Sequence, residues 1–183
     1  MLRILSVLAV VAQAFALLAS TDGVESPTKK FESVKYSFTL RYPATWYILR
    51  QDADTLAILS FPPSERLQGV VIKSGGASID AFPAPQNVND LEEWIAENQR
   101  GDTVLHRGIE KHNAAKSACN RITRVVVRSE IGPKSYVIVT RYYCSTSNGL
   151  YQVSVENWEG DPKQRYYQGV GLDIARSLRT VNH

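Results

Sequence analysis

Apolar and polar residues alternate along much of this chain, with the two-residue period of a half-buried β-strand. Between residues 31 and 42, large apolar side chains occupy the even positions from Tyr36 to Tyr42. Pro43 cannot donate a hydrogen bond to a sheet, so we expect this strand to end there and the next to begin at Trp46. Trp46 is expected to fill the core behind the turn, with an exposed position in a ligand groove as the alternative.

Two further apolar runs predict short strands over residues 55–61 and 69–74, and two consecutive prolines end the first of them. Residues 78–89 contain two more prolines and are expected to form an irregular connection. The strand signals return after residue 103.

The pattern changes to the helical period over residues 90–100. Asp90 lies three positions before Glu93, which is the spacing of a capping box at a helix N-terminus. Gly101 is suited to close the helix at its other end. The residues expected to share the buried face are Leu91, Trp94, Ile95 and Asn98.

A second helix is predicted over residues 162–181, with Asp161 as its cap and Pro162 in the first helical position. Gly169 and Gly171 weaken a helix, but they permit close packing on a sheet. The apolar stripe of this helix comprises Tyr167, Val170, Ile174, Leu178 and Val181.

Residues 103–158 predict three antiparallel strands joined by two hairpins. Asn148-Gly149 is a strong signal for a two-residue turn, and Ile131-Gly132 is taken as the second turn. These turns place the following residues opposite one another: Cys119 and Cys144, Val125 and Ile138, Cys144 and Val153, and Arg141 and Glu156.

The same registers sort the side chains onto two faces of the sheet. One face is predicted to be apolar, with Cys119, Val125, Val127, Tyr136, Ile138, Tyr142, Cys144, Tyr151, Val153 and Val155. The other is predicted to carry Arg124, Arg128, Arg141, Tyr143, Ser154 and Glu156, with Ile122 and Val126 among them.

The first residues have the features of a secretory signal: Arg3, then an apolar run, then small residues at 12, 14 and 16. We expect a signal peptide over residues 1–16, with cleavage between 16 and 20, an uncleaved membrane anchor being the alternative. A disordered leader over 17–30 and one domain over 31–183 would follow. The chain is then exported, to the periplasm or the extracellular space, without stable membrane insertion after cleavage.

Cys119 and Cys144 are the only two cysteines. In an oxidising compartment two thiols of one domain normally pair, and the predicted register sets these two within disulfide reach. We therefore expect a disulfide. A register slipped by two residues would instead leave two buried free thiols.

The net charge of +3 falls to +2 without Arg3, which argues against a general nucleic-acid binder. Residues 107–141 nevertheless hold eight basic residues and two acidic ones. The simpler interpretation is a solvent-exposed face without a binding role, on which Arg141 pairs with Glu156. The alternative hypothesis is a binding patch for an acidic protein partner or an envelope polymer, made of Arg124, Arg128, Arg141 and Tyr143.

No catalytic residue, cofactor site or metal site is indicated by the sequence. It has no nucleophile elbow and no phosphate-binding loop, and residues 169–175 imitate a dinucleotide fingerprint with Ile174 in place of the last small residue. His106, His112 and Cys119 do not match a zinc spacing.

The order of elements resembles the PsbP-like α/β/α sandwich family, which includes PsbP, a Ran-binding nuclear import factor and envelope proteins of the DcrB and LpqN type. The matching residues are Tyr36, Phe38, Tyr42-Pro43, Trp46 and 174–179. The resemblance implies an α+β fold, with a central antiparallel sheet packed with two main helices, and a non-enzymatic, protein-binding scaffold. It carries over no functional residue.

Two other functions remain open. A small-molecule or lipid carrier would have a pocket between the sheet and the C-terminal helix, lined by Tyr151, Tyr166 or Tyr167. An envelope hydrolase would show a concave cluster of ionisable groups with perturbed pKa values.

Overall fold

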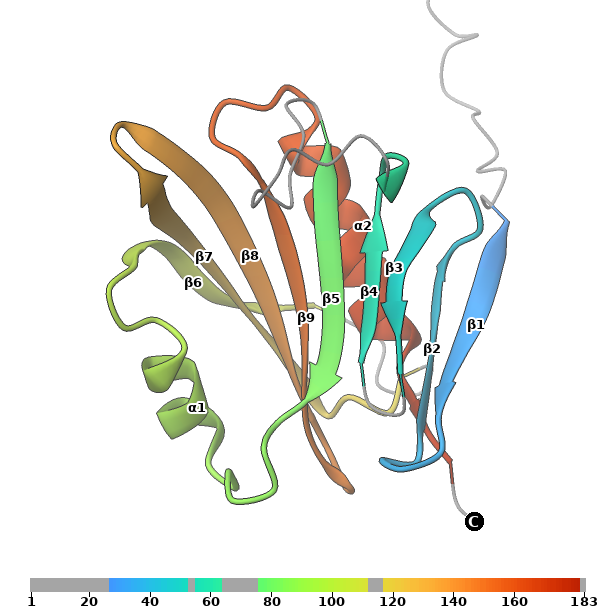
Figure 1. The fold of residues 1–183 in the computed structure, drawn as a ribbon. Coiled ribbons are helices and arrows are strands. Elements are labelled where there is room, and N and C mark those ends of the chain that lie inside the picture. The colour runs from blue at the N-terminus through green and yellow to red at the C-terminus, as the bar shows by residue number, and fades with distance from the viewer. Residues whose placement is uncertain (1–26, 53–54, 64–75, 112–116, 182–183) are drawn as a thin grey trace, which may run out of the picture.

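The computed structural model describes residues 27–52, 55–63, 76–111 and 117–181. Within them, a seven-stranded antiparallel sheet has the order β3-β4-β5-β9-β8-β7-β6, and a small sheet has the order β1-β2-β10 (Figure 1). The strands are Thr28–Ser33 (β1), Phe38–Pro43 (β2), Tyr47–Gln51 (β3), Leu56–Leu59 (β4), Ala77–Pro83 (β5), Thr103–Glu110 (β6), Arg121–Gly132 (β7), Ser135–Thr146 (β8), Gly149–Trp158 (β9) and Arg179–Thr180 (β10). The helices are Leu91–Glu97 (α1) and Gln164–Ser177 (α2).

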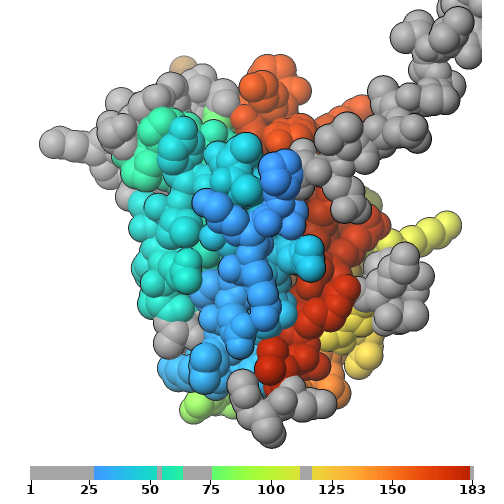
Figure 2. Space-filling model, turned by 90° about the vertical axis from the view of Figure 1, so that its right-hand side faces the viewer, coloured from blue at the N-terminus to red at the C-terminus, as the bar shows by residue number. Residues whose placement is uncertain are grey.

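Helix α2 lies between the two sheets. It packs on β8 and β9 of the large sheet and on β2 of the small one. Figure 2 shows the N-terminal strands in blue directly beside the C-terminal helix in red. The large core formed here contains Phe38 and Leu40 of β2, Tyr142 and Val155 of the large sheet, and Ile174 of α2.

Helix α1 packs on the opposite face of the large sheet and forms a second, smaller core. Asp90 accepts a hydrogen bond from the Glu93 backbone N–H at 2.8 Å, which confirms the predicted N-cap. Trp94 and Ile95 are the buried residues of α1, and the Trp94 ring meets the Tyr143 ring edge to face at 5.3 Å. The two helices therefore cover opposite faces of one sheet, which confirms the predicted α+β sandwich.

The turn after Pro43 is as predicted. Strand β2 ends at Pro43, β3 begins at Tyr47, and Trp46 is buried between them. Its ring lies 6.1 Å from that of Tyr167 on α2, so Trp46 fills the core.

The start of the domain differs from the prediction. Strand β1 already begins at Thr28, so the predicted leader is wrong for residues 28–30. The expected strand over 31–42 is broken by a turn in which Ser37 adopts a φ of 51°, and β1 and β2 pair as a hairpin. The predicted signal peptide over residues 1–16 and residues 17–26 lie outside the described residues.

Residues 78–82 belong to β5, where a connection was predicted. The prolines misled the interpretation, because Pro83 occupies the last position of the strand. The alternation of Ile79 and Ala81 with Ser78 and Asp80 has the two-residue period of a strand. The strand predicted over 69–74 lies outside the described residues.

Strands β8 and β9 pair two residues away from the predicted register. Cys144 lies opposite Tyr151, and Arg141 lies opposite Ser154. The turn begins one residue earlier because Thr146 Oγ1 accepts the Asn148 N–H at 3.1 Å, which leaves Gly149 to start β9. A shift by two keeps every side chain on its predicted face.

Strands β7 and β8 pair three residues away from the predicted register, and this error is consequential. Ile122 lies opposite Cys144, and Val125 lies opposite Arg141. The turn falls at Pro133 and Lys134, where Lys134 has a φ of 59°, and a bulge interrupts the pairing at Ile131. An odd shift exchanges the two faces of β7 relative to β8.

Helix α2 is shorter than the predicted 162–181. It ends at Ser177, and Arg179–Thr180 pair with β2 as β10. The Ser177 hydroxyl accepts the Arg41 N–H at 2.7 Å, so contacts with the small sheet compete with further helical turns. Within the described residues, no helix is long and apolar enough to cross a membrane.

Candidate functional site: a polar trough on the open face of the sheet

The four residues of the predicted binding patch do not share a face. Arg124 lies opposite Tyr142, and Arg128 lies opposite Ile138, which places both arginines on the α2 side. Arg141 and Tyr143 point to the α1 side, since they alternate with Tyr142 on the same strand. The predicted patch is therefore wrong as a single surface, and the exchanged faces of β7 are the reason.

Each of the three arginines also has a partner within the chain. Arg124 contacts Glu110 at 3.4 Å and donates to the Gln168 side chain at 3.0 Å. Arg141 contacts Asp102 at 3.2 Å, instead of the expected Glu156.

Arg128 donates two hydrogen bonds to Glu159, at 2.8 and 2.9 Å, and stacks over the Tyr136 ring. Tyr143 is buried, and this burial raises its pKa to about 12. The patch residues are thus occupied by ion pairs or by the core.

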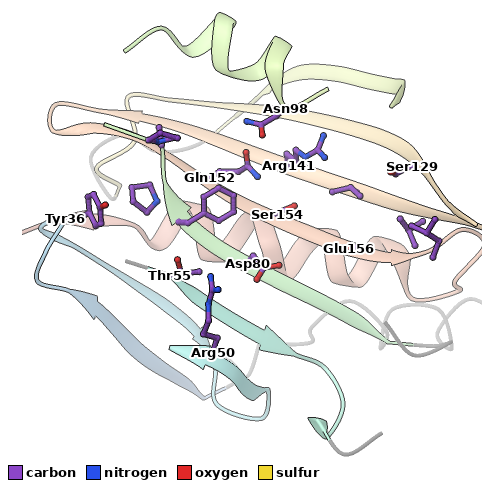
Figure 3. Close-up of a pocket in the computed structure, with 17 residues that line it drawn as sticks. Tyr36, Arg50, Thr55, Asp80, Asn98, Ser129, Arg141, Gln152, Ser154 and Glu156 are labelled. Atoms are coloured by element: carbon purple, nitrogen blue, oxygen red, sulfur yellow. The ribbon is translucent and has the colours of Figure 1, made fainter. Parts of the chain in front are cut away.

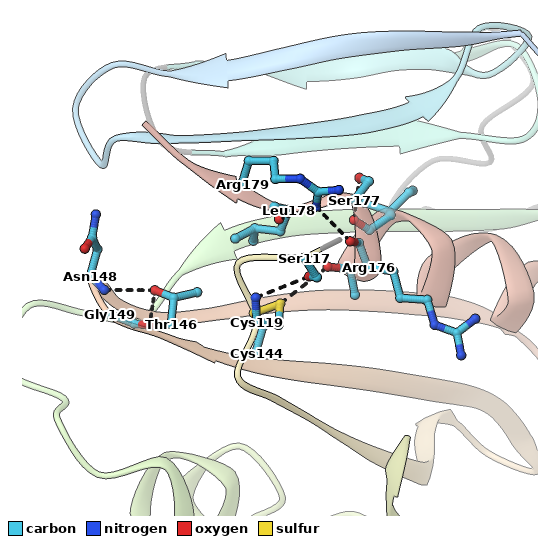
Figure 4. Close-up of a disulfide and its surroundings, with 12 residues drawn as sticks. Ser117, Cys119, Cys144, Thr146, Asn148, Gly149, Arg176, Ser177, Leu178 and Arg179 are labelled. Atoms are coloured by element: carbon cyan, nitrogen blue, oxygen red, sulfur yellow. Dashed lines mark hydrogen bonds between the residues drawn. A yellow bond between two sulfur atoms is a disulfide. The ribbon is translucent and has the colours of Figure 1, made fainter. Parts of the chain in front are cut away.

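The disulfide between Cys119 and Cys144 is confirmed, with a Cα–Cα distance of 5.3 Å (Figure 4). The two residues are not strand partners as predicted, because Cys119 precedes β7. The Asn120 N–H donates to the Ser145 carbonyl at 2.7 Å and holds the segment before β7 against β8.

The predicted carrier pocket between the sheet and α2 is filled. A Cβ at Gly171 would come within 2.2 Å of Val155 Cγ2, so α2 and the sheet are in direct contact. Tyr151 and Tyr167 are buried in the core, while Tyr166 is exposed and borders a hollow between α2 and β2. The predicted pocket is therefore absent between α2 and the large sheet at Gly171, whereas the hollow at Tyr166 lies between α2 and the small sheet.

A larger hollow lies on the α1 side of the sheet, over the strands that α1 leaves uncovered. Its volume is about 720 Å³. Figure 3 shows it bordered by the C-terminal end of α1 on one side and by β3 and β4 on the other. We call it the trough, and its polar lining includes Arg50, Asp80, Arg141, Gln152, Ser154 and Glu156.

The strand register brings these side chains onto one face. Asp80 of β5 lies opposite Ser154 of β9, which in turn lies opposite Arg141 of β8. Glu156 lies opposite Ser78, one step further along the same pair of strands. Asp80 and Glu156 are therefore diagonal neighbours across two adjacent strands, within reach of one ligand group.

Burial raises the pKa of both carboxyl groups. For Asp80 the nearby Arg50 guanidinium partly offsets this effect of desolvation. For Glu156 the neighbouring Asp80 raises the pKa further, and Arg141 lowers it. Two mutually repelling carboxylates in a partly desolvated hollow favour a bound proton or a bound cation.

The trough offers hydrogen-bond acceptors on a rigid sheet: two carboxylates, the Ser154 hydroxyl and the Gln152 amide. Among the described residues, no group of three His, Cys, Asp or Glu side chains could hold a metal ion. His106 lies on the exposed edge strand β6, away from the trough, and His112 is outside the described residues. Glu156 lies on the predicted polar face. The sequence pattern does not predict a site at Asp80, because the prolines near it predict an irregular connection.

Comparisons with known proteins identify the fold. No protein-family model and no curated protein matches this chain. The crystal structure of the Ran-binding protein Mog1p of Saccharomyces cerevisiae is similar, with a TM-score of 0.55 and 12% identity over 86% of this chain and 97% of that one.

A Mog1 variant is similar with a TM-score of 0.50 and 12% identity, over 85% of this chain and 97% of that one. Cyanobacterial PsbP (CyanoP) from Synechocystis has a TM-score of 0.49 and 11% identity, over 89% of this chain and 98% of that one. The likeness to Mog1p carries the conclusion, and at this identity it concerns the fold. This chain has the α+β sandwich fold of Mog1p, and the predicted PsbP-like fold is thereby confirmed.

Proposed function

We propose that this chain is an exported, non-enzymatic binding protein that holds an extended segment of a partner protein in the trough. The observation that carries the proposal is a polar hollow of about 720 Å³ on the sheet face opposite α2. Binding groups set on a sheet are held more precisely than groups on loops. The Ran-binding activity named for Mog1p supports protein binding as a function of this fold.

The shape of the trough supports an extended ligand. Its lining runs from Tyr36 and Pro83 at one end to Ser129 and Ile131 at the other. From Gln152 to Glu156 the floor alone extends about 13 Å, at the usual rise of a strand. An extended peptide of this length presents backbone donors and alternate side chains to such a surface.

Export to the cell envelope is part of the proposal. It is supported by the charged start, the apolar run and the small residues within positions 1–16. The Cys119–Cys144 disulfide is in keeping with an oxidising compartment.

A photocrosslinking experiment in the envelope tests the proposal. A photoreactive benzoylphenylalanine at Ser129, on the rim of the trough, is expected to form an adduct with one partner protein. The matched control carries it at Arg165, which is exposed on α2. The mass of the recovered chain reports at the same time whether the signal has been removed between residues 16 and 20.

A second variant makes the result specific to the trough. Ser154→Trp places a large side chain over the trough floor and is expected to abolish the adduct, while Arg165→Trp is expected to leave it intact. Equal adducts from both probe positions, or an adduct that survives Ser154→Trp, would contradict docking in the trough.

One observation favours a second candidate, a hydrolase. The trough is the concave cluster of perturbed carboxyl groups that an envelope hydrolase was expected to show. Hydrolysis of glycosides uses two carboxyl groups, one as acid and one as base or nucleophile. Turnover of glycoside substrates that is lost with Asp80→Asn and Glu156→Gln would replace the binding proposal by this one.

A further inference from the structure

Among the described residues, the cations near the two trough carboxylates are Arg50 and Arg141, and neither is in direct contact with them. Asp80 and Glu156 make neither an ion pair within 4 Å nor a side-chain hydrogen bond there. The nearby arginines have other partners: both Arg141 Nη atoms lie 3.2 Å from Asp102 Oδ2, and Arg50 lies 3.2 Å from Asp52. Asp80 and Glu156 are therefore compensated only at a distance and have no directly bonded partner on the trough floor.

Gln152 provides an independent indication of a missing ligand. Its side chain lines the trough between Phe82 and Tyr143, and only 4% of the residue is exposed (Figure 3). Its Oε1 atom accepts no hydrogen bond within the described part of the chain. A buried amide oxygen without a donor destabilises the free protein, and a ligand that supplies a donor removes this cost.

The positions of the three acceptors define the ligand. Gln152 and Glu156 each lie diagonally from Asp80, on opposite sides of it along β9. A guanidinium or ammonium group between Asp80 and Glu156 would offset both negative charges, and a guanidinium also presents several donors in a plane. The backbone N–H of an extended segment that carries this group could then reach Gln152.

We propose that the trough binds a cationic side chain, an arginine or a lysine, of a segment of the partner protein. Asp80 and Glu156 hold the positive charge, and Gln152 accepts a hydrogen bond from the same segment. This inference rests on the proposed function and gives the partner a chemistry opposite to the acidic one expected from the sequence.

A titration of the oxidised chain with short peptides tests the inference. The probe is the acetylated and amidated peptide Ala-Ala-Arg-Ala-Ala, and its control carries citrulline, the neutral isostere of arginine. Amide chemical shifts of ¹⁵N-labelled protein are expected to change along β5 and β9. The citrulline peptide is expected to bind at least tenfold more weakly.

Substitutions test whether Asp80 and Glu156 bind the positive charge of the peptide. Asp80→Asn with Glu156→Gln is expected to weaken binding of the arginine peptide at least tenfold. The matched control, Glu32→Gln with Asp173→Asn, removes the same charge from exposed positions on β1 and α2 and is expected to change affinity less than twofold. Arg50→Gln removes a competing cation and is expected to tighten binding.

Equal binding of the two peptides, or unchanged binding to the double trough variant, would overturn the inference. The photocrosslinking experiment separates this failure from that of the proposed function. If the Ser129 adduct forms and survives Asp80→Asn with Glu156→Gln, a partner docks without the cationic contact. If no adduct forms but the arginine peptide still binds more tightly than the citrulline peptide, the cationic site is supported. The proposed docking of a partner protein in the trough is then contradicted.

Discussion

Gly169 and Gly171 lie two positions apart on α2 and have different surroundings. A Cβ at 171 would lie 2.2 Å from Val155 Cγ2 and 3.1 Å from Tyr142 Cε2, whereas a Cβ at 169 meets no atom within 4 Å. One glycine permits the contact between helix and sheet. The other only weakens the helix.

Alanine substitutions should therefore have opposite effects. We expect Gly171→Ala to lower the free energy of unfolding by about 1–3 kcal/mol, because it overpacks the interface with Val155. We expect Gly169→Ala to raise it by about 0.5–1 kcal/mol through helix propensity. Urea unfolding of the two variants measures both, and a Gly171→Ala variant as stable as the wild type would show that α2 can move away from the sheet.

At the scale of elements, the disulfide joins the segment before β7 to the middle of the sheet. Cys119 and Cys144 are separated by 25 positions, so the bond closes the β7–β8 hairpin at its open end. Both residues are buried in the larger core. The bond restricts the unfolded chain much more than the folded one.

We expect loss of the bond to lower the free energy of unfolding by about 3 kcal/mol in the loop-entropy account. Cys119→Ala alone and Cys119→Ala with Cys144→Ala should then cost nearly the same, because either change removes the bond. Urea unfolding compares them, and thiol titration of the denatured, unreduced wild type should find no free thiol. Two free thiols per chain, or a double variant much less stable than Cys119→Ala alone, would contradict the bond.

The β7–β8 hairpin also shows where prediction from sequence fails. Alternation identified both strands, since Val125 and Val127 share one parity, and Tyr142 and Cys144 share another. Their relative register depended on the assumed turn at Ile131-Gly132, and the turn lies at Pro133 and Lys134. An odd error in register leaves each strand correct and exchanges its faces, which is why the arginine patch was wrong.

At the scale of the whole molecule, the two faces of the large sheet are used differently. The α2 face is filled by the larger core. The α1 face is only partly covered, and its open part carries the trough with Asp80 and Glu156. The proposed contact with a cationic side chain rests on these two carboxylates.

Asp80 in the trough contributes to the pH dependence of the free energy of unfolding. The folded-state pKa of Asp80 is raised, so protonation of this group favours the folded state. The stabilisation of the folded state by this protonation is complete below the ordinary aspartate pKa. It is lost as the pH rises through the raised pKa of the folded state. We therefore expect Asp80→Asn to have a larger free energy of unfolding than the wild type at neutral pH. The difference between the two proteins should be smaller at acidic pH.

Urea unfolding at pH 4 and pH 7 tests this expectation, with the exposed Asp173→Asn as the matched control. The control should change stability little at either pH. If Asp80→Asn is less stable than the wild type at pH 7, the carboxylate has a stabilising partner in the free protein, and the trough is not a site of uncompensated charge.

The sequence by itself determined the local elements of this protein. The alternation around Phe38, the proline at 43, the Asp90 cap and the apolar stripe of α2 act over a few residues, so they identify strands, a turn and helices without the rest of the chain. The order of these elements was enough to indicate the fold. Two cysteines, together with a start that predicts a secretory signal, were enough to expect their disulfide.

Only the tertiary structure decided which side chains meet. Asp80, Ser154 and Arg141 are far apart in sequence and come into one row through the register of three strands. A shift of one residue in any of those pairings would send its side chains to the other face. The trough depends on several such pairings at once, and their registers are determined by turns, bulges and core packing that no local pattern contains.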